Sequence, residues 1–164
     1  MKTLILIACS AAKLAHAAPA GELYAGQLFQ LSKAYALASG DDWLILSAKH
    51  GLLDPSKTID PYDQRLSHRK AWGARQALKL WSLARTHHYS RLVLLAGRDY
   101  CEPILSDPLA AESFAEIYRP LQGLGIGHQR QQLARMVSTA RAEKAHRQLK
   151  SLLTAIWHDL EVSQ

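Results

Sequence analysis

Residues 43–55 read WLILSAKHGLLDP, and this stretch decides the expected fold. Its first four residues are apolar without alternation, which is typical of a strand covered on both faces, as in a parallel sheet. Ser47, Lys49 and His50 follow at once. A plain connection needs only turn residues, yet a nucleophile, a cation and a proton carrier stand here within four positions. The stretch therefore predicts a buried strand with reactive side chains at its carboxyl end.

Two further apolar runs, at residues 3–8 and 92–96, resemble the run at 43–46. Patterns typical of helices fill the gaps between the runs, at residues 26–39 and 67–87. Strands that alternate with helices predict an α/β layered fold around a mostly parallel sheet. Gly40 marks the end of the first helix, because glycine readily adopts the left-handed conformation that terminates helices.

The chain is long enough for one domain with a substantial core. Of its 164 residues 48% are hydrophobic and 21% charged, which is ordinary for a globular protein. We expect a single α/β domain over residues 1–164, with a sheet core at 1–108 and a helical extension at 109–164. The two cysteines form no metal-ligand spacing, so we expect a reduced, cytoplasmic protein without a metal or another cofactor.

The first twenty residues also resemble a signal peptide, with Lys2 before an apolar stretch and Ala-His-Ala after it. The strongly apolar part, residues 4–8, is short for such a peptide, and Lys13 interrupts the alanine-rich segment after it. We therefore interpret the segment as the first strand. No stretch approaches the ~18 apolar residues of a membrane span, so we expect no membrane association.

In the last third, residues 109–118 predict a short acidic helix, and two further helices are expected at 129–140 and 141–160. The last of these carries an apolar stripe that we interpret as core. The stripe consists of Leu149, Leu152, Leu153, Ile156 and Trp157.

The net charge of +6 is unevenly distributed. Residues 61–98 hold eight Lys or Arg and one acidic residue, and residues 119–150 hold seven and one. The acidic segment 99–118 separates these two blocks. If the blocks share one face, they favour a polyanionic partner such as nucleic acid; the alternative is two solvated helix surfaces.

In an open parallel sheet, ligands bind beyond the carboxyl ends of the strands. Each apolar run ends in small residues followed by a basic one, which suits a phosphate-bearing ligand, although turn chemistry alone can produce the same pattern. The aromatic ring of Tyr24 could stack on a base or pack on the core. The candidate ligand-binding residues are Cys9, Ser10, Lys13, Tyr24, Gly51, Tyr62, Gly97 and Arg98.

The candidate catalytic residues are Ser47, Lys49, His50 and Asp63. His50 could move a proton near neutral pH. Lys49 could be a nucleophile with a lowered pKa or, more simply, a clamp on phosphate. Asp63 could orient His50 or cap the next helix. For His50 the structural alternative is a hydrogen bond within the turn.

The glycine-rich stretch 123–127 lacks the preceding strand of a dinucleotide fingerprint. It resembles the hairpin of helix-hairpin-helix elements, which present backbone N–H groups to DNA phosphates. Ordinary turns between helices use glycine as well. The candidate nucleic-acid-binding residues are Arg119, Gly125, Gly127, Arg130 and Arg135.

The stretch SAKHGLLDP with Pro61-Tyr62-Asp63 resembles a largely uncharacterised bacterial family, to which Cys9-Ser10-x-x-Lys13 and Tyr24-x-Gly26 also correspond. The chain is more distantly similar to the peroxide-stress family YaaA, with His50 in place of that family's tyrosine. That resemblance implies an α/β fold with a helix-hairpin-helix element and DNA binding under oxidative stress. The positions matched are Ser47, Gly51, Leu52, Leu53, Pro55, Pro61 and Tyr62.

Two functions compete. The first is a YaaA-like protein that binds DNA or nucleotide phosphates at the strand-end rim. The second is an enzyme acting on a nucleobase or modified nucleoside, of glycosylase, lyase or transferase type, through Ser47, Lys49 and His50. The Cys-Ser-x-x-Lys motif also resembles one in archaeosine synthase, a tRNA-modifying enzyme. A purely structural domain would leave the polar strand ends unexplained.

Overall fold

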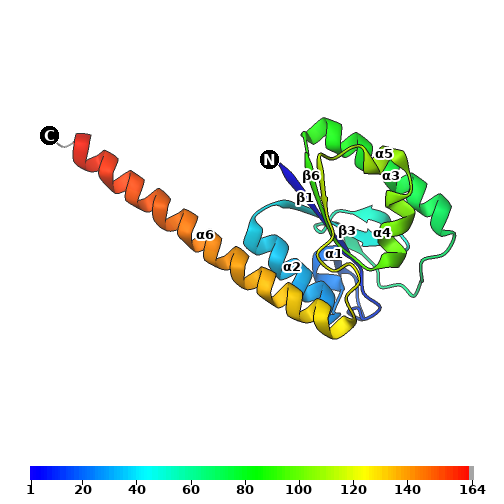
Figure 1. The fold of residues 1–164 in the computed structure, drawn as a ribbon. Helices are drawn as coiled ribbons and strands as arrows, with labels where there is room; N and C mark the ends of the chain where they lie inside the picture. The colour runs from blue at the N-terminus through cyan, green and yellow to red at the C-terminus, as the bar shows by residue number, and fades with distance from the viewer. Residues whose placement is uncertain (163–164) are drawn as a thin grey trace.

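The computed structural model describes residues 1–162, so positions 163 and 164 of the expected domain lie outside the described residues. Five strands form one sheet in the order β4-β3-β1-β6-β7 (Figure 1). Four of them run parallel, and β4 pairs antiparallel with β3 at one edge. The bounds are β1 Thr3–Ala8, β3 Asp42–Ser47, β4 Gly51–Leu53, β6 Arg91–Leu95 and β7 Glu116–Tyr118.

Helices cover both faces of this sheet (Figure 1). Helix α2 (Gln27–Ser39) packs beside α6 (Ile126–Val162) on one face. The other face carries α3 (Arg69–His87), which packs on α4 (Arg98–Leu105) and α5 (Pro108–Ala111). A separate two-stranded ladder pairs β2 (Ala18–Pro19) with β5 (Thr58–Ile59), and β2 leads directly into the short helix α1 (Ala20–Leu23). The expected α/β architecture is confirmed.

The central strand β1 shows why its sequence is apolar throughout. Leu4 and Leu6 pack into the core beneath α3, while Ile5 and Ile7 pack into the core beneath α2. All four side chains are at most 1% exposed. Because both faces of this strand are buried, its apolar residues do not alternate with polar ones. The segment that resembles a signal peptide is thus the middle of the sheet.

Glycines set the ends and the contacts of the helices. Gly40 ends α2 with a φ of 77°, as predicted. Helix α3 begins at Arg69, two residues after the predicted start. Within α3, a Cβ atom on Gly73 would lie 2.1 Å from the carbonyl oxygen of Pro103. Only glycine therefore allows α3 and α4 to approach this closely.

The prediction of an acidic helix at residues 109–118 is wrong. Helix α5 ends at Ala111, and Glu116–Tyr118 forms strand β7, parallel to β6. The reason is the free edge of β6, which needs a hydrogen-bonding partner. Glu116 lies opposite Arg91 and is ion-paired with it at 3.0 Å, while Ile117 packs on the core.

The two helices expected at 129–140 and 141–160 are one helix, α6. The interpretation of its distal stripe as core is also wrong, because Leu149, Leu152, Leu153, Ile156 and Trp157 are each 50% exposed or more. This part of α6 projects away from the sheet (Figure 1). Within residues 1–162, no helix is both long enough and apolar enough to cross a membrane.

Candidate functional site

The carboxyl ends of four parallel strands meet at one edge of the sheet. Strand β1 pairs in register with both β3 and β6, and β7 pairs with β6. Cys9, Ser47 and Gly97 therefore lie at the same edge, as predicted. Arg119 follows β7 and joins them there. We call this edge the strand-end rim.

The N-terminal motifs interlock at this rim. The hydroxyl of Ser10 accepts the N–H of Gly26 at 3.1 Å and donates to the carbonyl of Ala12 at 2.7 Å. A Cβ atom on Gly26 would lie 2.6 Å from that of Ser10, so a larger residue would separate the two segments. Three residues further on, Lys13 and Tyr24 form an isolated antiparallel bridge. The two motifs thus act as one structural unit.

Three hydroxyl groups join this unit to the loop that follows β3. The Tyr62 hydroxyl lies 2.7 Å from the Tyr24 hydroxyl and 2.7 Å from the Ser47 hydroxyl. Ser47 Oγ also accepts the backbone N–H groups of Lys49 at 3.2 Å and His50 at 3.0 Å. We call Ser47, Tyr62 and Tyr24 the hydroxyl chain. It links every motif on which the family resemblance rests.

Burial limits what the hydroxyl chain can do chemically. Ser47 and Tyr24 are both 0% exposed. Burial raises the pKa of Tyr24 and that of Tyr62, so both phenols keep their protons. Two backbone N–H groups engage the lone pairs of Ser47 Oγ, which leaves its O–H to donate to the Tyr62 hydroxyl. Ser47 therefore orders the turn.

Two lysines lie over the same aromatic ring. Lys13 Nζ is 4.4 Å and Lys49 Nζ is 5.5 Å from the centroid of the Tyr62 ring. Lys13 Nζ is also 5.7 Å from the centroid of the Tyr24 ring. A cation over an exposed ring gains about 0.5–1 kcal/mol. The aromatic rings therefore hold positive charge at the rim without neutralising it.

His50 carries a buried nitrogen that is not satisfied. Its Nε2 finds no hydrogen-bond partner among residues 1–162. Burial, followed by the charges of Lys49 and Lys57, lowers the pKa of His50, so the ring is neutral at pH 7. Asp63, the expected orienting residue, is exposed, and in the described part of the chain it makes no hydrogen bond with His50.

Helix α3 fixes the turn from behind. Gln76 Oε1 accepts the N–H of Leu52 at 2.9 Å, and the Trp72 indole donates to the carbonyl of Ser47 at 3.3 Å. Gly51 has a φ of 68°, and a Cβ atom there would lie 2.5 Å from Gln76 Oε1. Glycine is thus required both by its backbone conformation and by this contact.

A cavity of about 470 Å³ opens between β1 and β6, and we call it the switch-point crevice. The strand order β3-β1-β6, with α2 and α3 on opposite faces, makes this gap the topological switch point at which α/β sheets bind ligands. The ends of both strands and the first turns of α2 and α6 line it. Cys9, Ser10, Gly97 and Arg130 are the candidate residues that line it.

The polar groups of the crevice suit an anion. Gly26, the N-cap of α2, has no side chain to cap the first N–H groups of the helix. The long helix α6 also begins here and brings Arg130. Helix N-termini carry partial positive charge and free N–H donors. The remaining walls are largely apolar and include Leu28, Phe29, Leu95, Leu121 and Ile126.

A second, more polar hollow of about 280 Å³ lies between the turn after β3 and helix α3. Lys49 and His50 line it together with Arg75 and Lys79 of α3, and with His68 before that helix. No carboxylate stands among its lining residues within the described chain. We call it the cationic hollow.

The structure therefore divides the candidate residues of the strand-end rim between two cavities. Lys49 and His50 line the cationic hollow, whereas Ser10 and Gly97 line the switch-point crevice. Arg98 faces away: its side chain is 81% exposed and its Nε lies 2.6 Å from Glu102 Oε1. The rim residues lie at one edge of the sheet, but they line two different cavities.

Around Arg119, the rim is half-buried. The Arg119 Nε has no hydrogen-bond partner in the described residues. The Arg119 guanidinium lies near Cys101, and burial raises the pKa of the Cys101 thiol. On the other side of β6, Cys9 Sγ lies 3.2 Å from the Tyr100 hydroxyl. Burial and this contact raise the pKa of Tyr100.

The prediction of a helix-hairpin-helix element around the glycine-rich stretch is wrong. A strand and a turn, not a helix, precede Gly125, and Gly127 already lies in the first turn of α6. Arg130 lines the switch-point crevice, whereas Arg135 lines a different hollow beside Glu143. Most of the two basic blocks lies on α3 and α6, which cover opposite faces of the sheet, although Arg91 of the first block lines the same hollow as Arg135.

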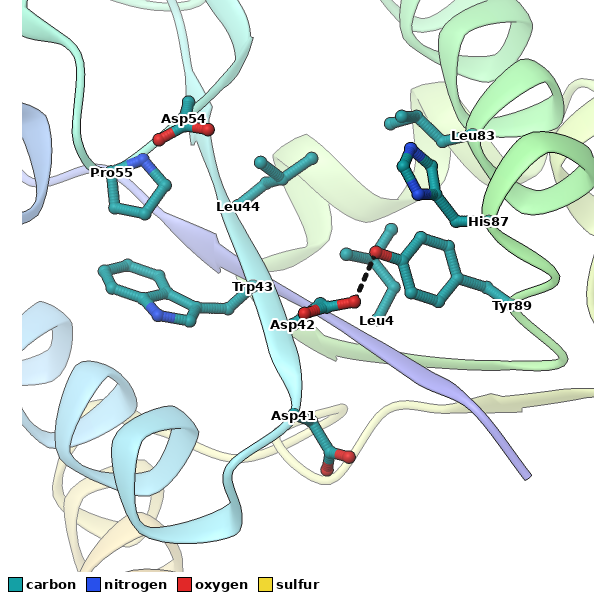
Figure 2. Close-up of a pocket in the computed structure, with 10 residues that line it drawn as sticks. All are labelled: Leu4, Asp41, Asp42, Trp43, Leu44, Asp54, Pro55, Leu83, His87 and Tyr89. Carbon is teal, nitrogen blue, oxygen red and sulfur yellow. Dashed lines mark hydrogen bonds between the residues drawn. The ribbon is translucent and has the colours of Figure 1, made fainter.

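A further hollow, of about 620 Å³, lies near the amino ends of the strands, and in the described chain none of the candidate residues lines it (Figure 2). It follows the outer edge of β3, where β4 pairs only with Ile45, Leu46 and Ser47. Asp42 accepts a hydrogen bond from the Tyr89 hydroxyl at 2.7 Å in this hollow (Figure 2). Among residues 1–162, no group of three or more His, Cys, Asp or Glu is placed to hold a metal ion.

Sequence reasoning missed the contribution of α3. Trp72 and Gln76 lie one turn apart on α3 and contact the turn after β3. Arg75 and Lys79 also lie one turn apart on α3, and they line the cationic hollow. The i, i+4 spacing of each pair was visible in the sequence. Their common target, the turn at Gly51, was not, because it depends on how residues 54–68 cross the rim.

The family of unknown function DUF6884 matches residues 4–135, which include the whole rim and the first turns of α6. No curated protein matches the chain. The match covers most of the sequence, so the chain belongs to the DUF6884 family.

Proposed function

We propose that this member of DUF6884 binds a phosphate-bearing small molecule, a nucleotide, in the switch-point crevice. The observation that carries the proposal is the position of the crevice at the switch point, framed by the N-termini of two helices and by Arg130. Its volume of about 470 Å³ is within the range of ligand pockets. The phosphates would face the helix termini, and the apolar walls would face the base or sugar.

Small residues allow a phosphate group to come close to the backbone of the crevice. Ser10, Gly26 and Gly97 line the crevice, and backbone N–H groups can come close to a phosphate only where side chains are small. Glycines 97, 125 and 127 have open space at the position of a Cβ atom. Lys13 adds positive charge at the rim through its place over the Tyr62 ring.

A broader form of the proposal includes nucleic acid, as the resemblance to YaaA implies. In that form the cationic hollow, with Lys49, Arg75 and Lys79, would contact backbone phosphates, and the protein would act in a stress response. The nucleotide form has stronger support, because α3 and α6, which carry most of the two basic blocks, cover opposite faces of the sheet.

Calorimetric titration and thermal unfolding of the full chain with ATP, AMP and inorganic phosphate test the proposal. At 100 times its dissociation constant, a ligand stabilises the fold by about 2.7 kcal/mol. That corresponds to a rise in Tm of roughly 5–10 °C for a protein of this size. Arg130→Ala should reduce the rise, whereas Arg141→Ala, exposed on the same helix, should not. If none of the three ligands raises Tm, the nucleotide proposal is wrong.

A second candidate is an enzyme acting on a nucleobase or modified nucleoside. The observation in its favour is the neutral His50 next to Lys49 in the cationic hollow, whose Nε2 has no hydrogen-bond partner among the described residues, since a neutral imidazole can accept a proton. Incubation with nucleosides, nucleotides and tRNA, followed by mass spectrometry, would reveal a product. His50→Gln should abolish turnover and keep nucleotide binding; a product rate that this change leaves intact would remove His50 from the mechanism.

A further inference from the structure

The distal part of α6 exposes a continuous apolar stripe. Leu149, Leu152, Leu153, Ile156 and Trp157 are 50–68% exposed. They lie within nine positions, on successive turns of one helix. Scattered apolar residues are normal on a protein surface, but a contiguous row of five large ones marks an interaction site.

This stripe does not continue the inner face of α6. Leu133, Val137 and Ala140 are buried where α6 packs on α2 and the sheet. Leu149 follows Ala140 by nine residues, which is about two and a half turns at 3.6 residues per turn. The two apolar faces therefore point in opposite directions. The chain's own core cannot cover the distal stripe without a break in the helix.

The projecting segment has the length that pairing needs. Arg147 donates to the carbonyl of Ser39, the last residue of α2, at 3.4 Å, and α6 then continues to Val162 beyond the sheet (Figure 1). At ~1.5 Å per residue, this free part is on the order of 22 Å long. Two such segments can overlap antiparallel, with the two α/β domains at opposite ends.

We propose that the distal half of α6 pairs antiparallel with the same segment of a second copy of this chain, about a two-fold axis near Leu153. Such an interface is self-complementary, because residue 149 of one copy faces residue 157 of the other. Burying five large side chains in each copy would remove on the order of 1,200 Å² in total, the lower limit for a specific interface.

The sequence also fits this direction of pairing. Lys150 stands at the edge of the stripe, one position after Leu149. Parallel pairing would bring the two copies of Lys150 to the same end of the interface, where their like charges repel, whereas antiparallel overlap centred on position 153 separates them.

Sedimentation of the full chain at concentrations from ~1 to ~100 µM tests the proposal. An interface at the lower size limit is expected to associate and dissociate within this range of concentration. We expect a reversible shift from monomer to dimer. Leu152→Glu should abolish the dimer, and Ser151→Glu, its exposed neighbour on the opposite side of the helix, should leave it intact. Both residues are exposed, so neither change should alter the circular dichroism of the fold.

Disulfide trapping tests the orientation. In a Cys9→Ala background, copies with Leu149→Cys mixed with copies carrying Trp157→Cys should cross-link, whereas either alone should not. Cross-linking of Leu149→Cys with itself would overturn the antiparallel arrangement. A wild type that stays monomeric at 100 µM, or that binds phosphatidylcholine vesicles only as a monomer, would overturn pairing altogether.

Discussion

The phenolic oxygens of Tyr24 and Tyr62 lie 2.7 Å apart, although 38 positions separate the two residues in the sequence. Tyr24 precedes α2, and Tyr62 lies in the long connection between β5 and α3. Through Ser47, their contact reaches the end of β3. The two sides of the rim are therefore one rigid unit, and changes on one side should affect the other.

Tyr62→Phe should destabilise the fold by roughly 1–3 kcal/mol, because it leaves the buried hydroxyls of Tyr24 and Ser47 short of a partner. Urea denaturation measures the loss. Tyr118→Phe provides a control, since that tyrosine is 38% exposed and should change stability little. Equal stability of the two variants would mean that the hydroxyl chain adds nothing to the fold.

Gly51→Ala should cost more stability than Gly123→Ala. Both glycines have positive φ, 68° and 74°, so alanine costs about 1–2 kcal/mol at either position. Only at Gly51 must Gln76 also move and give up its bond to Leu52, which adds roughly 1 kcal/mol. Thermal unfolding compares them; indistinguishable losses would show that Gln76 adjusts without cost.

Stability should depend on pH through His50. Its pKa in the folded protein is lowered, while the unfolded chain titrates near its ordinary value of about 6.5. As the pH falls below about 6.5, the unfolded chain takes up the proton first, so the free energy of unfolding decreases until the folded protein is protonated as well. Above that pH the contribution is complete.

His50→Gln should flatten this decrease, measured by urea titrations between about pH 5 and 8. His146→Gln, exposed on α6, serves as the matched substitution and should keep the wild-type slope. If the slope survives in His50→Gln, another group is responsible for it.

Binding to duplex DNA, if it uses the cationic hollow, should involve about three phosphates. The slope of log K against log salt is then about −3, at −0.9 per phosphate. Reversing Arg75 and Lys79 to Glu should abolish binding, whereas reversing Arg130 and Arg135 on the opposite face should not. Fluorescence anisotropy distinguishes these outcomes, and equal losses would mean that both basic blocks touch DNA.

The sheet was predictable because its three main strands are short, continuous apolar runs, which are typical of strands buried on both faces. Strand β7 was not, since Glu116–Tyr118 contains only three residues and is a strand because β6 offers it an edge. Helix α6 was divided in the prediction at residues 140 and 141, where its apolar pattern changes face. That change reflects what covers each face, not a break in the helix.

The site was predictable only at the level of the sheet. Parallel strands bring their carboxyl ends together, so the common edge of Cys9, Ser47 and Gly97 is a consequence of topology. The division into two cavities is not. It depends on tertiary packing: α3 closes the hollow behind the turn through Gln76, and the starts of α2 and α6 meet the ends of β1 and β6 around the crevice. No local pattern encodes these contacts.

The half-covered outer edge of β3 has a consequence for solubility. A bare strand edge can template a strand of another chain and so begin aggregation. Here Asp41, Asp42, Asp54 and Pro55 surround the open part, and carboxylates and proline both discourage added strands. The hydrogen bond from Tyr89 lowers the pKa of Asp42, and those from Ser56 lower that of Asp54. The protective charge therefore persists into acid solution, where less well supported carboxylates would already have lost it.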